Sequence, residues 1–224
     1  LRSFAIGRLS RNAAFLAGFL VTAAAVRIGL VAASANSIPY SDEWIAAIDD
    51  VLRPLTTGQF TILDLFRSHN EHTLAPTRLV TLIAIWFNHG QFDNVPVALL
   101  NALLYAGAMA IPVYLFFRHA SGSTRLFAVV LGLVALAPLE GEDLIFGFQN
   151  QYYFLIAGTA TTLWLAATSI STTKRSLVGY ATVAFATCVS MGTGFIAAAL
   201  GVLVCALRWP REQQHRRALI QRIG

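Results

Sequence analysis

Long apolar runs separated by short polar connections dominate this chain. The first apolar run extends from residue 13 to about residue 34, and the later runs cover 95–117, 126–139, 152–170, 177–189 and 195–207. A helix needs roughly 20 apolar residues to cross the hydrocarbon core of a bilayer. The pattern therefore predicts an all-α, polytopic membrane protein with about six transmembrane helices, the shorter of which need flanking residues or a locally thinner bilayer.

The composition points the same way. Hydrophobic residues make up 56% of the chain and charged residues only 12%, whereas charged residues account for about a quarter of a soluble domain. The net charge of +5 comes from short clusters of Arg and Lys beside the apolar runs. This is the pattern of cytoplasmic anchoring and not of nucleic-acid binding. Because the chain begins at Leu1, we expect it to be the N-terminal part of a longer protein, organised as a single domain.

The basic segments predict the orientation of the chain. Basic residues precede the first apolar run and recur in 118–125, 174–175 and 208–222. Positively charged loops prefer the cytoplasmic side, and all of these segments lie there only if residues 74–87 do not cross the membrane. We therefore predict that 74–87 is a helix lying at the outer interface, with Trp86 as an anchor.

Three polar segments share the outer side in this topology. Residues 36–94 form one large outer loop that contains the interfacial helix, and 140–151 and 190–194 are shorter outer connections. For the basic tail, residues 209–224, we favour a connecting loop over an amphipathic helix.

The outer loop opens with an acidic pair, Asp42 and Glu43. Adjacent carboxylates on a helix point in different directions, so one suits a reacting group and the other a cation or the backbone. A carboxylate near the membrane surface can act as a general base for a hydroxyl nucleophile. We prefer Asp42 for this role because it follows the first apolar run closely, with Glu43 as the alternative. In a structural interpretation, Ser41 or Asp42 instead caps a helix.

The same loop ends in the sequence His69-Asn70-Glu71-His72. On a helix, His69 and His72 would share a face and, with Glu71, offer ligands for a divalent metal. Hydrogen bonding of these side chains to a phosphate or a sugar is the alternative. No cofactor other than this metal is indicated.

Amides and aromatic residues gather in the segment 147–154, which contains Gln149 and Gln151 and follows the acidic residue Glu142. A sugar ring requires directional hydrogen bonds and an aromatic face for its C–H groups, so these three residues are candidate substrate contacts. An aromatic belt at the membrane interface explains the same composition. The segment 192–194 reads Gly-Thr-Gly, which suits a tight turn or an anion-binding backbone.

Taken in order, these features resemble the N-terminal half of the GT-C superfamily of integral membrane glycosyltransferases. The resemblance rests on Asp42-Glu43, on the interfacial stretch 72–91 and on the turn at 192–194. It implies that an acid of the first outer loop acts in catalysis and that the donor is a sugar on a polyprenyl phosphate. This chain has His72-Thr73-Leu74-Ala75-Pro76 where many relatives have His/Lys-Pro-Pro-Leu, and Thr193 where a Lys is common.

Both departures concern positions that bind phosphate in such enzymes. The available substitutes in this chain are the arginines Arg27, Arg53, Arg67 and Arg78. We therefore expect a glycosyltransferase of the bacterial inner membrane with a cytoplasmic N-terminus. The enzyme would bind its lipid-linked donor from the surrounding membrane lipids. The sequence specifies neither the sugar nor the acceptor.

Two other functions fit a chain of this kind. A flippase or transporter of a lipid-linked sugar would need polar groups near the middle of the membrane and on both sides, whereas here they collect on one side. A non-enzymatic membrane subunit would use the acidic loop to bind a partner.

Overall fold

The structure is a computed structural model that describes residues 2–119, 123–137, 145–168 and 174–223. Within these ranges, side chains are described except in 2–11, 119, 123–125, 174 and 209–223. The candidate contact Glu142 lies outside the described residues.

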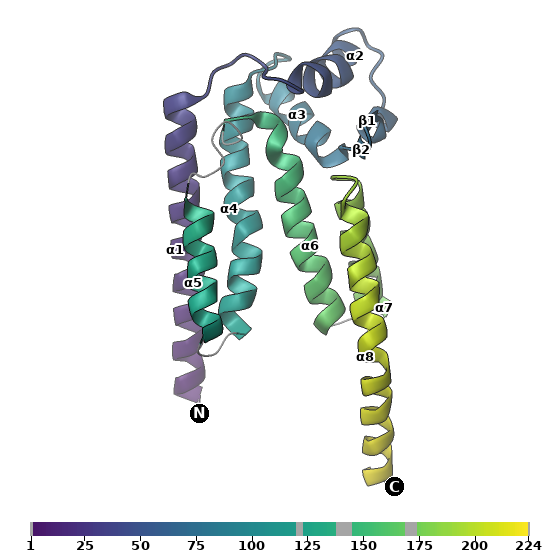
Figure 1. Ribbon diagram of the computed structural model, residues 1–224. Coiled ribbons are helices and arrows are strands. Elements are labelled where there is room, and N and C mark those ends of the chain that lie inside the picture. Colours follow the sequence, from purple (N-terminus) through teal and green to yellow (C-terminus); the bar gives the residue numbers. More distant parts are fainter. Residues whose placement is uncertain (1, 120–122, 138–144, 169–173, 224) are drawn as a thin grey trace.

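Six long helices form the body of the described chain (Figure 1). They are α1 (Arg2–Ser34), α4 (Asn94–His119), α5 (Ser123–Leu136), α6 (Asn150–Thr168), α7 (Lys174–Cys188) and α8 (Gly194–Ile223). Each helix overlaps one of the apolar runs, although α1 begins earlier and α8 ends later than its run, and the all-α fold class is confirmed. The connecting loop favoured for the tail is wrong, because α8 continues through residues 209–223.

The helices pack in a continuous series. Helices α1, α4 and α5 contact one another, and α6 joins α4 to α7 and α8. The first group is held by a core of small and aromatic side chains, which comprises Phe19, Ala23, Ala106, Ala110, Val113 and Ala135. Both chain ends lie at the end of the body opposite to the loop that follows α1 (Figure 1).

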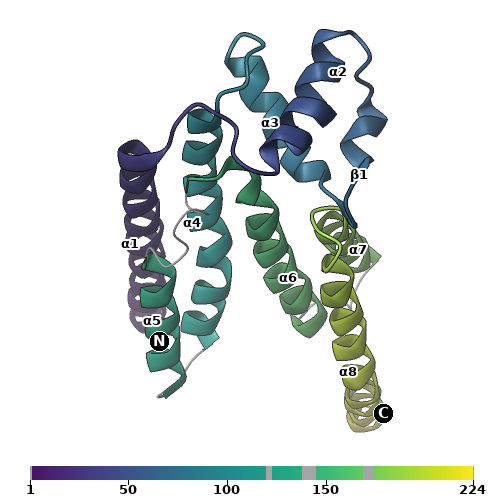
Figure 2. The same cartoon turned by 45° about the horizontal axis from the view of Figure 1, so that its top comes forward.

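That loop, residues 35–93, folds over one end of the helical body, and we call it the cap (Figure 2). It contains a π-helix η1 (Trp44–Leu52), a short helix α2 (Arg53–Thr56), a 3₁₀ helix η2 (Ile62–Phe66), the strands β1 (Ser68–His69) and β2 (His72–Thr73), and helix α3 (Ala75–Phe87). Pro76 fits in the first turn of α3, where its missing N–H costs no helical hydrogen bond. The helix predicted over 74–87 therefore forms, and it lies obliquely across the end of the long helices (Figures 1 and 2).

Two of the described helices are long and apolar enough to cross a membrane. They are Asn12–Ser34 within α1 and Asn94–Arg118 within α4. Shorter apolar helices cover Ala75–Phe87, Leu126–Leu136 and Gly194–Arg208. By length and composition the structure therefore supports two candidate spans, fewer than the six expected from the apolar runs.

The segments at the cap end of the body come from distant parts of the sequence. The 3₁₀ turn η4 (Gly147–Gln149), which precedes α6, contacts α4 beside the cap. At the α7–α8 turn, the backbone N–H of Ala75 donates to the carbonyl of Val189 at 3.0 Å. The three segments assigned to one side by the charge pattern thus meet at one end of the molecule, as far as they are described.

Candidate functional site

The carboxylate of Glu43 lies buried between the cap and η4. Only 2% of this residue is exposed. Its Oε2 accepts a hydrogen bond from the Tyr40 backbone N–H at 2.9 Å, and the backbone N–H groups of Gly147 and Phe148 also donate to the carboxylate. Burial raises the pKa of Glu43 to about 7, against the opposing effect of these backbone donors. Glu43 therefore accepts hydrogen bonds from backbone N–H groups, which is one of the two roles expected for the acidic pair.

Two asparagines of α4 hold the same turn from the other side. The Asn94 side-chain oxygen accepts from the Gly147 backbone N–H at 3.0 Å, and the Asn101 amide donates to the Gly147 carbonyl at 2.7 Å. A Cβ atom on Gly147 would lie 2.5 Å from Glu43 Oε1 and 2.7 Å from Asn94 Oδ1. We call Glu43, Asn94, Asn101, Gly147 and Phe148 the polar latch, because they fasten the cap to α4 and to the start of α6.

Asp42 has the opposite environment. It is exposed, and its side chain has no hydrogen bond or ion pair within the described part of the chain. Its backbone carbonyl accepts from the N–H groups of Ile45 and Ala46 at 3.1 and 2.8 Å. Residue 43 occupies the N-cap position of η1 and makes no side-chain capping bond, so the capping interpretation of Ser41 or Asp42 is wrong. Asp42 is the member of the pair that an external substrate can reach.

A second buried polar cluster lies inside the cap. Arg78 is fully buried, and its Nη2 donates to Asp50 Oδ2 at 2.7 Å. Its Nη1 donates to the carbonyl of Leu65 at 3.3 Å and to that of Arg67. These contacts join α3 to η1 and η2. With no exposed surface, Arg78 cannot reach an external phosphate and instead holds the cap together, contrary to its predicted role.

The histidine cluster has a different geometry from the one predicted. His69 and His72 are opposite each other on the antiparallel strands β1 and β2, because Asn70 adopts a left-handed conformation (φ 52°) that turns the chain. They do not share a helical face. His69 Nδ1 lies 3.8 Å from Asp50 Oδ2, and the described residues contain no group of three or more side chains able to hold a metal ion.

Both imidazoles are packed against neighbouring segments. The His69 ring meets the Phe148 ring edge to face, with centroids 5.4 Å apart. The His72 ring lies against Gly192, where a Cβ atom would approach His72 Nδ1 to 2.6 Å. The histidines therefore link the cap to η4 and to the α7–α8 turn. Glu71, between them, is exposed.

The other predicted substrate contacts divide by exposure. Arg27 is buried in α1, with its guanidinium 3.4 Å above the ring of Tyr105, an arrangement that stabilises the cation by its attraction to the π face. Arg53 is exposed and forms an ion pair with Asp49 at 2.8 Å, and Arg67 is exposed on the cap. Of the four arginines, only Arg53 and Arg67 can meet a phosphate from outside.

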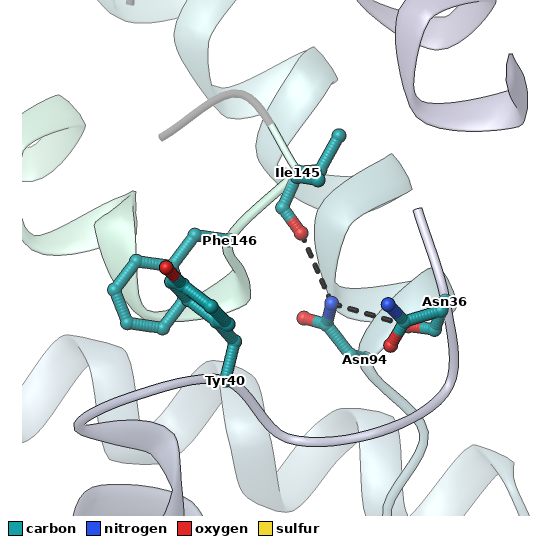
Figure 3. A pocket seen from close by; sticks show the side chains of 5 residues that line it. All are labelled: Asn36, Tyr40, Asn94, Ile145 and Phe146. Carbon is teal, nitrogen blue, oxygen red and sulfur yellow. Dashed lines mark hydrogen bonds between the residues drawn. The ribbon is translucent and has the colours of Figure 1, made fainter. Parts of the chain in front are cut away.

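Gln149 and Gln151 are buried at the start of α6. Neither lines the small cavity found beside them. That cavity measures about 150 Å³ and lies between the cap and η4 (Figure 3), with walls formed by Asn36, Tyr40, Asn94, Ile145 and Phe146. The Tyr40 and Phe146 rings meet edge to face, with centroids 5.5 Å apart.

Several residues of the site were missed by sequence reasoning. Asn94 and Asn101 are seven residues apart, so they lie on one face of a helix, and two amides at this spacing in an apolar run are a signal for a polar contact inside the bundle. Asp50 and Tyr40 have no comparable signal, because their partners Arg78 and Phe146 are distant in sequence.

Comparison of the chain with models of protein families, with curated proteins and with solved structures gives no match.

Proposed function

We propose that this chain is the core of a membrane-embedded glycosyltransferase resembling the GT-C superfamily. Its donor is a sugar on a polyprenyl phosphate, and transfer takes place at the cap end of the helical body. The observation that carries the proposal is the division of the acidic pair: Glu43 is buried on backbone N–H groups, whereas Asp42 is exposed and unpaired within the described residues.

A multi-pass arrangement in the membrane, with the N-terminus in the cytoplasm, accounts for the surface of the long helices. In the candidate spans of α1 and α4, most of the apolar residues are not buried against other parts of the chain. Helices α5, α7 and α8 also expose large apolar side chains along their length, among them Leu126, Phe127, Leu133, Leu177, Phe185, Phe195, Val202 and Leu207. Soluble monomers rarely leave such continuous apolar surface in water. A lipid environment accounts for this apolar surface. Local thinning of the bilayer would match its thickness to the short helices α5 and α7.

In the proposed reaction, Asp42 accepts the proton of an acceptor hydroxyl as its oxygen attacks the anomeric carbon and the lipid phosphate leaves. Glu43 does not contact substrate. It is a positioning residue, because its bonds to Tyr40, Gly147 and Phe148 fix the turn that carries Asp42. The exposed cation of Arg67, on the same cap, is suited to attract the lipid phosphate.

The test uses the purified protein in nanodiscs with undecaprenyl phosphate carrying single hexoses and pentoses. Transfer to water or to added alcohols is followed by mass spectrometry, so the assay does not require the natural acceptor. Asp42→Asn keeps the shape of the side chain but removes its basicity, and turnover should fall by about 10²–10⁴-fold. The matched control is Asp49→Asn, an exposed acid of the same loop that pairs with Arg53, for which turnover should be close to normal.

Normal turnover of Asp42→Asn would remove Asp42 as the base. If the wild-type protein releases sugar from none of the donors in the panel, the proposed function is contradicted.

A flippase of lipid-linked sugars is the second candidate, and Arg27 is the observation that favours it. This buried cation lies within a candidate span, about two turns before the end of α1, and ionisable residues inside the membrane often mark a transport path. Movement of a fluorescent polyprenyl-phosphate sugar between leaflets without chemical conversion would support this candidate over transfer.

A further inference from the structure

We infer that the cavity beside Tyr40 binds one neutral sugar ring of the acceptor, so that the acceptor hydroxyl belongs to a carbohydrate. This inference rests on the proposed function and specifies the class of its acceptor. It is carried by the size, the lining and the position of the cavity.

The size admits one small ring. The cavity has a volume of about 150 Å³, below the roughly 300–1,000 Å³ of sites for drug-sized ligands. A monosaccharide unit is of suitable size, whereas a peptide segment or a whole lipid head group with its chains is too large. The ligand in the cavity is therefore one unit of a molecule that continues outside it.

The described lining consists of two aromatic, two amide and one aliphatic side chain, none of which is charged. Among the described residues, its walls are Asn36, Tyr40, Asn94, Ile145 and Phe146. The aromatic pair of Tyr40 and Phe146 offers surface for the C–H groups of a sugar (Figure 3). Among the described lining residues, a phosphate or carboxylate ligand would find no cation, and an ammonium group would find no carboxylate. An uncharged ring with both C–H and O–H groups is the chemistry that matches.

Together, the two amide side chains can accept hydrogen bonds from ligand hydroxyl groups and donate hydrogen bonds to them. Asn94 Oδ1 accepts from the Gly147 N–H, and an amide oxygen has a second lone pair for a ligand O–H. Asn36 Oδ1 accepts from the Ile38 N–H at 3.0 Å, and its amide N–H groups have no partner within the described chain. Sugar hydroxyls donate and accept, so they can satisfy both groups.

The walls are held in place before a ligand arrives. The Asn94 amide donates to the carbonyls of Asn36 at 3.3 Å and Ile145 at 3.0 Å, as Figure 3 shows. The Tyr40 backbone N–H donates to Glu43, and the Tyr40 ring contacts the Phe146 ring edge to face. A cavity whose walls are already bonded to one another loses little conformational entropy on binding.

Its position places the ligand beside the proposed base. Asp42 follows Tyr40 by two residues in a turn closed by the Glu43 N–H and the Tyr40 carbonyl at 3.0 Å. The α-carbons of Tyr40 and Asp42 are at most ~7.6 Å apart, because consecutive α-carbons are separated by about 3.8 Å. A sugar in the cavity can therefore present a hydroxyl near Asp42.

The experiment measures binding of methyl glycosides to the wild-type protein in nanodiscs by saturation-transfer NMR. The panel contains neutral hexosides and pentosides, the charged analogues glucuronate and glucosamine, and glycerol as a non-ring control. We expect a subset of the neutral glycosides to bind. Tyr40→Ala and Asn36→Ala should each weaken this binding by about ten-fold. A loss of this size is expected when one contact is removed and a ligand group is left desolvated without a partner.

Ile38→Ala is the matched control, because Ile38 is 64% exposed in the same linker and does not line the cavity. Its binding should equal that of the wild type. Asn36→Ala changes an exposed side chain, so it keeps the test decisive if Tyr40→Ala does not fold. The glycoside that binds should also become the acceptor when it is added to the transfer assay.

Absence of glycoside binding, binding of charged analogues alone, or binding unaffected by both variants would overturn the inference. Release of the donor sugar to water by the wild-type protein tells the two proposals apart. If release occurs without glycoside binding, only this inference fails; if no donor is used, the proposed function fails.

Discussion

The helical body and the cap are held together by different kinds of contact. Between α1, α4 and α5 the hydrophobic core is made of alanines, one valine and a phenylalanine, with the stacked pair of Arg27 and Tyr105 as a buried polar contact. In the cap, the buried contacts centre on the charged side chains Glu43 and Arg78. Apolar contacts are non-directional, whereas a buried charge tolerates only the geometry that satisfies it.

This difference bears on what each region does. Because apolar contacts are non-directional, a body held by them is compatible with a lipid environment and tolerates small shifts of its helices. A cap held by buried hydrogen bonds places Asp42, Tyr40 and η4 in one arrangement, as a site for chemistry requires. The predictions below test this contrast by removing one contact at a time.

The largest effect on stability should follow Arg78→Met. The change leaves Asp50 and the carbonyls of Leu65 and Arg67 without their donor, and loss of one partner of a buried pair costs about 3–5 kcal/mol. Thermal and chemical denaturation in detergent would measure the free energy of unfolding. Arg53→Met is the matched control: its ion pair with Asp49 is exposed, so the loss should be about 0–1 kcal/mol. Equal losses would show that the buried cluster is no more important than a surface pair.

The second effect is a pH dependence produced by Glu43. Its pKa is about 7 in the folded protein and 4.5 in the reference state, so the folded state binds more protons between these values. The stabilising contribution is complete below pH 4.5 and is lost as the pH rises to about 7. The loss amounts to about 3 kcal/mol.

Glu43→Gln removes this titration, and the control is the same pH series on the variant. The difference in unfolding free energy between wild type and variant should change over this pH interval and be constant above it. A difference that is constant from pH 4 to pH 8 would contradict the buried, protonatable state of Glu43.

A third, smaller effect should come from Gly147→Ala. The new methyl group would meet the Glu43 and Asn94 oxygens at 2.5 and 2.7 Å, and overpacking of this kind costs about 1–3 kcal/mol. Gly107→Ala in α4 is the matched change in the body, because a Cβ atom there meets nothing within 4 Å. It should leave stability unchanged or raise it by about 0.5–1 kcal/mol. Melting temperatures of both variants decide the comparison, and a tolerated Gly147→Ala would mean that the latch is loose.

The smallest effect should come from Tyr105→Phe, which probes a polar contact inside the body. The variant loses the hydrogen bond from the tyrosine hydroxyl to the carbonyl of Ala135, at 2.7 Å, but keeps a ring beneath Arg27. We expect a loss of about 1 kcal/mol, measured by the same denaturation experiments. A loss as large as that of Arg78→Met would remove the distinction between body and cap.

The sequence by itself determined the helices of this protein. Hydrophobic periodicity and run length are local properties, and they located each long helix and also helix α3 with its Pro76 start, but they missed the extension of α1 to Arg2 and of α8 to Ile223. The charge pattern predicted that 36–94, 140–151 and 190–194 lie on one side of the membrane; this stays a prediction, and the described parts of these segments lie at the same end of the molecule. The number of membrane spans stays a prediction beyond α1 and α4.

Only the tertiary structure decided which polar side chains turn inward. Asp42 and Glu43 are adjacent and chemically similar, yet one is exposed and the other buried, because two of the backbone donors of Glu43, Gly147 and Phe148, come from a turn about a hundred residues further along the chain. Arg78 had the sequence properties of a phosphate ligand, but it is fully buried and its two Nη groups donate to Asp50 and to two backbone carbonyls. The partner of a polar group is set by contacts between distant segments, and no local pattern of residues encodes that choice.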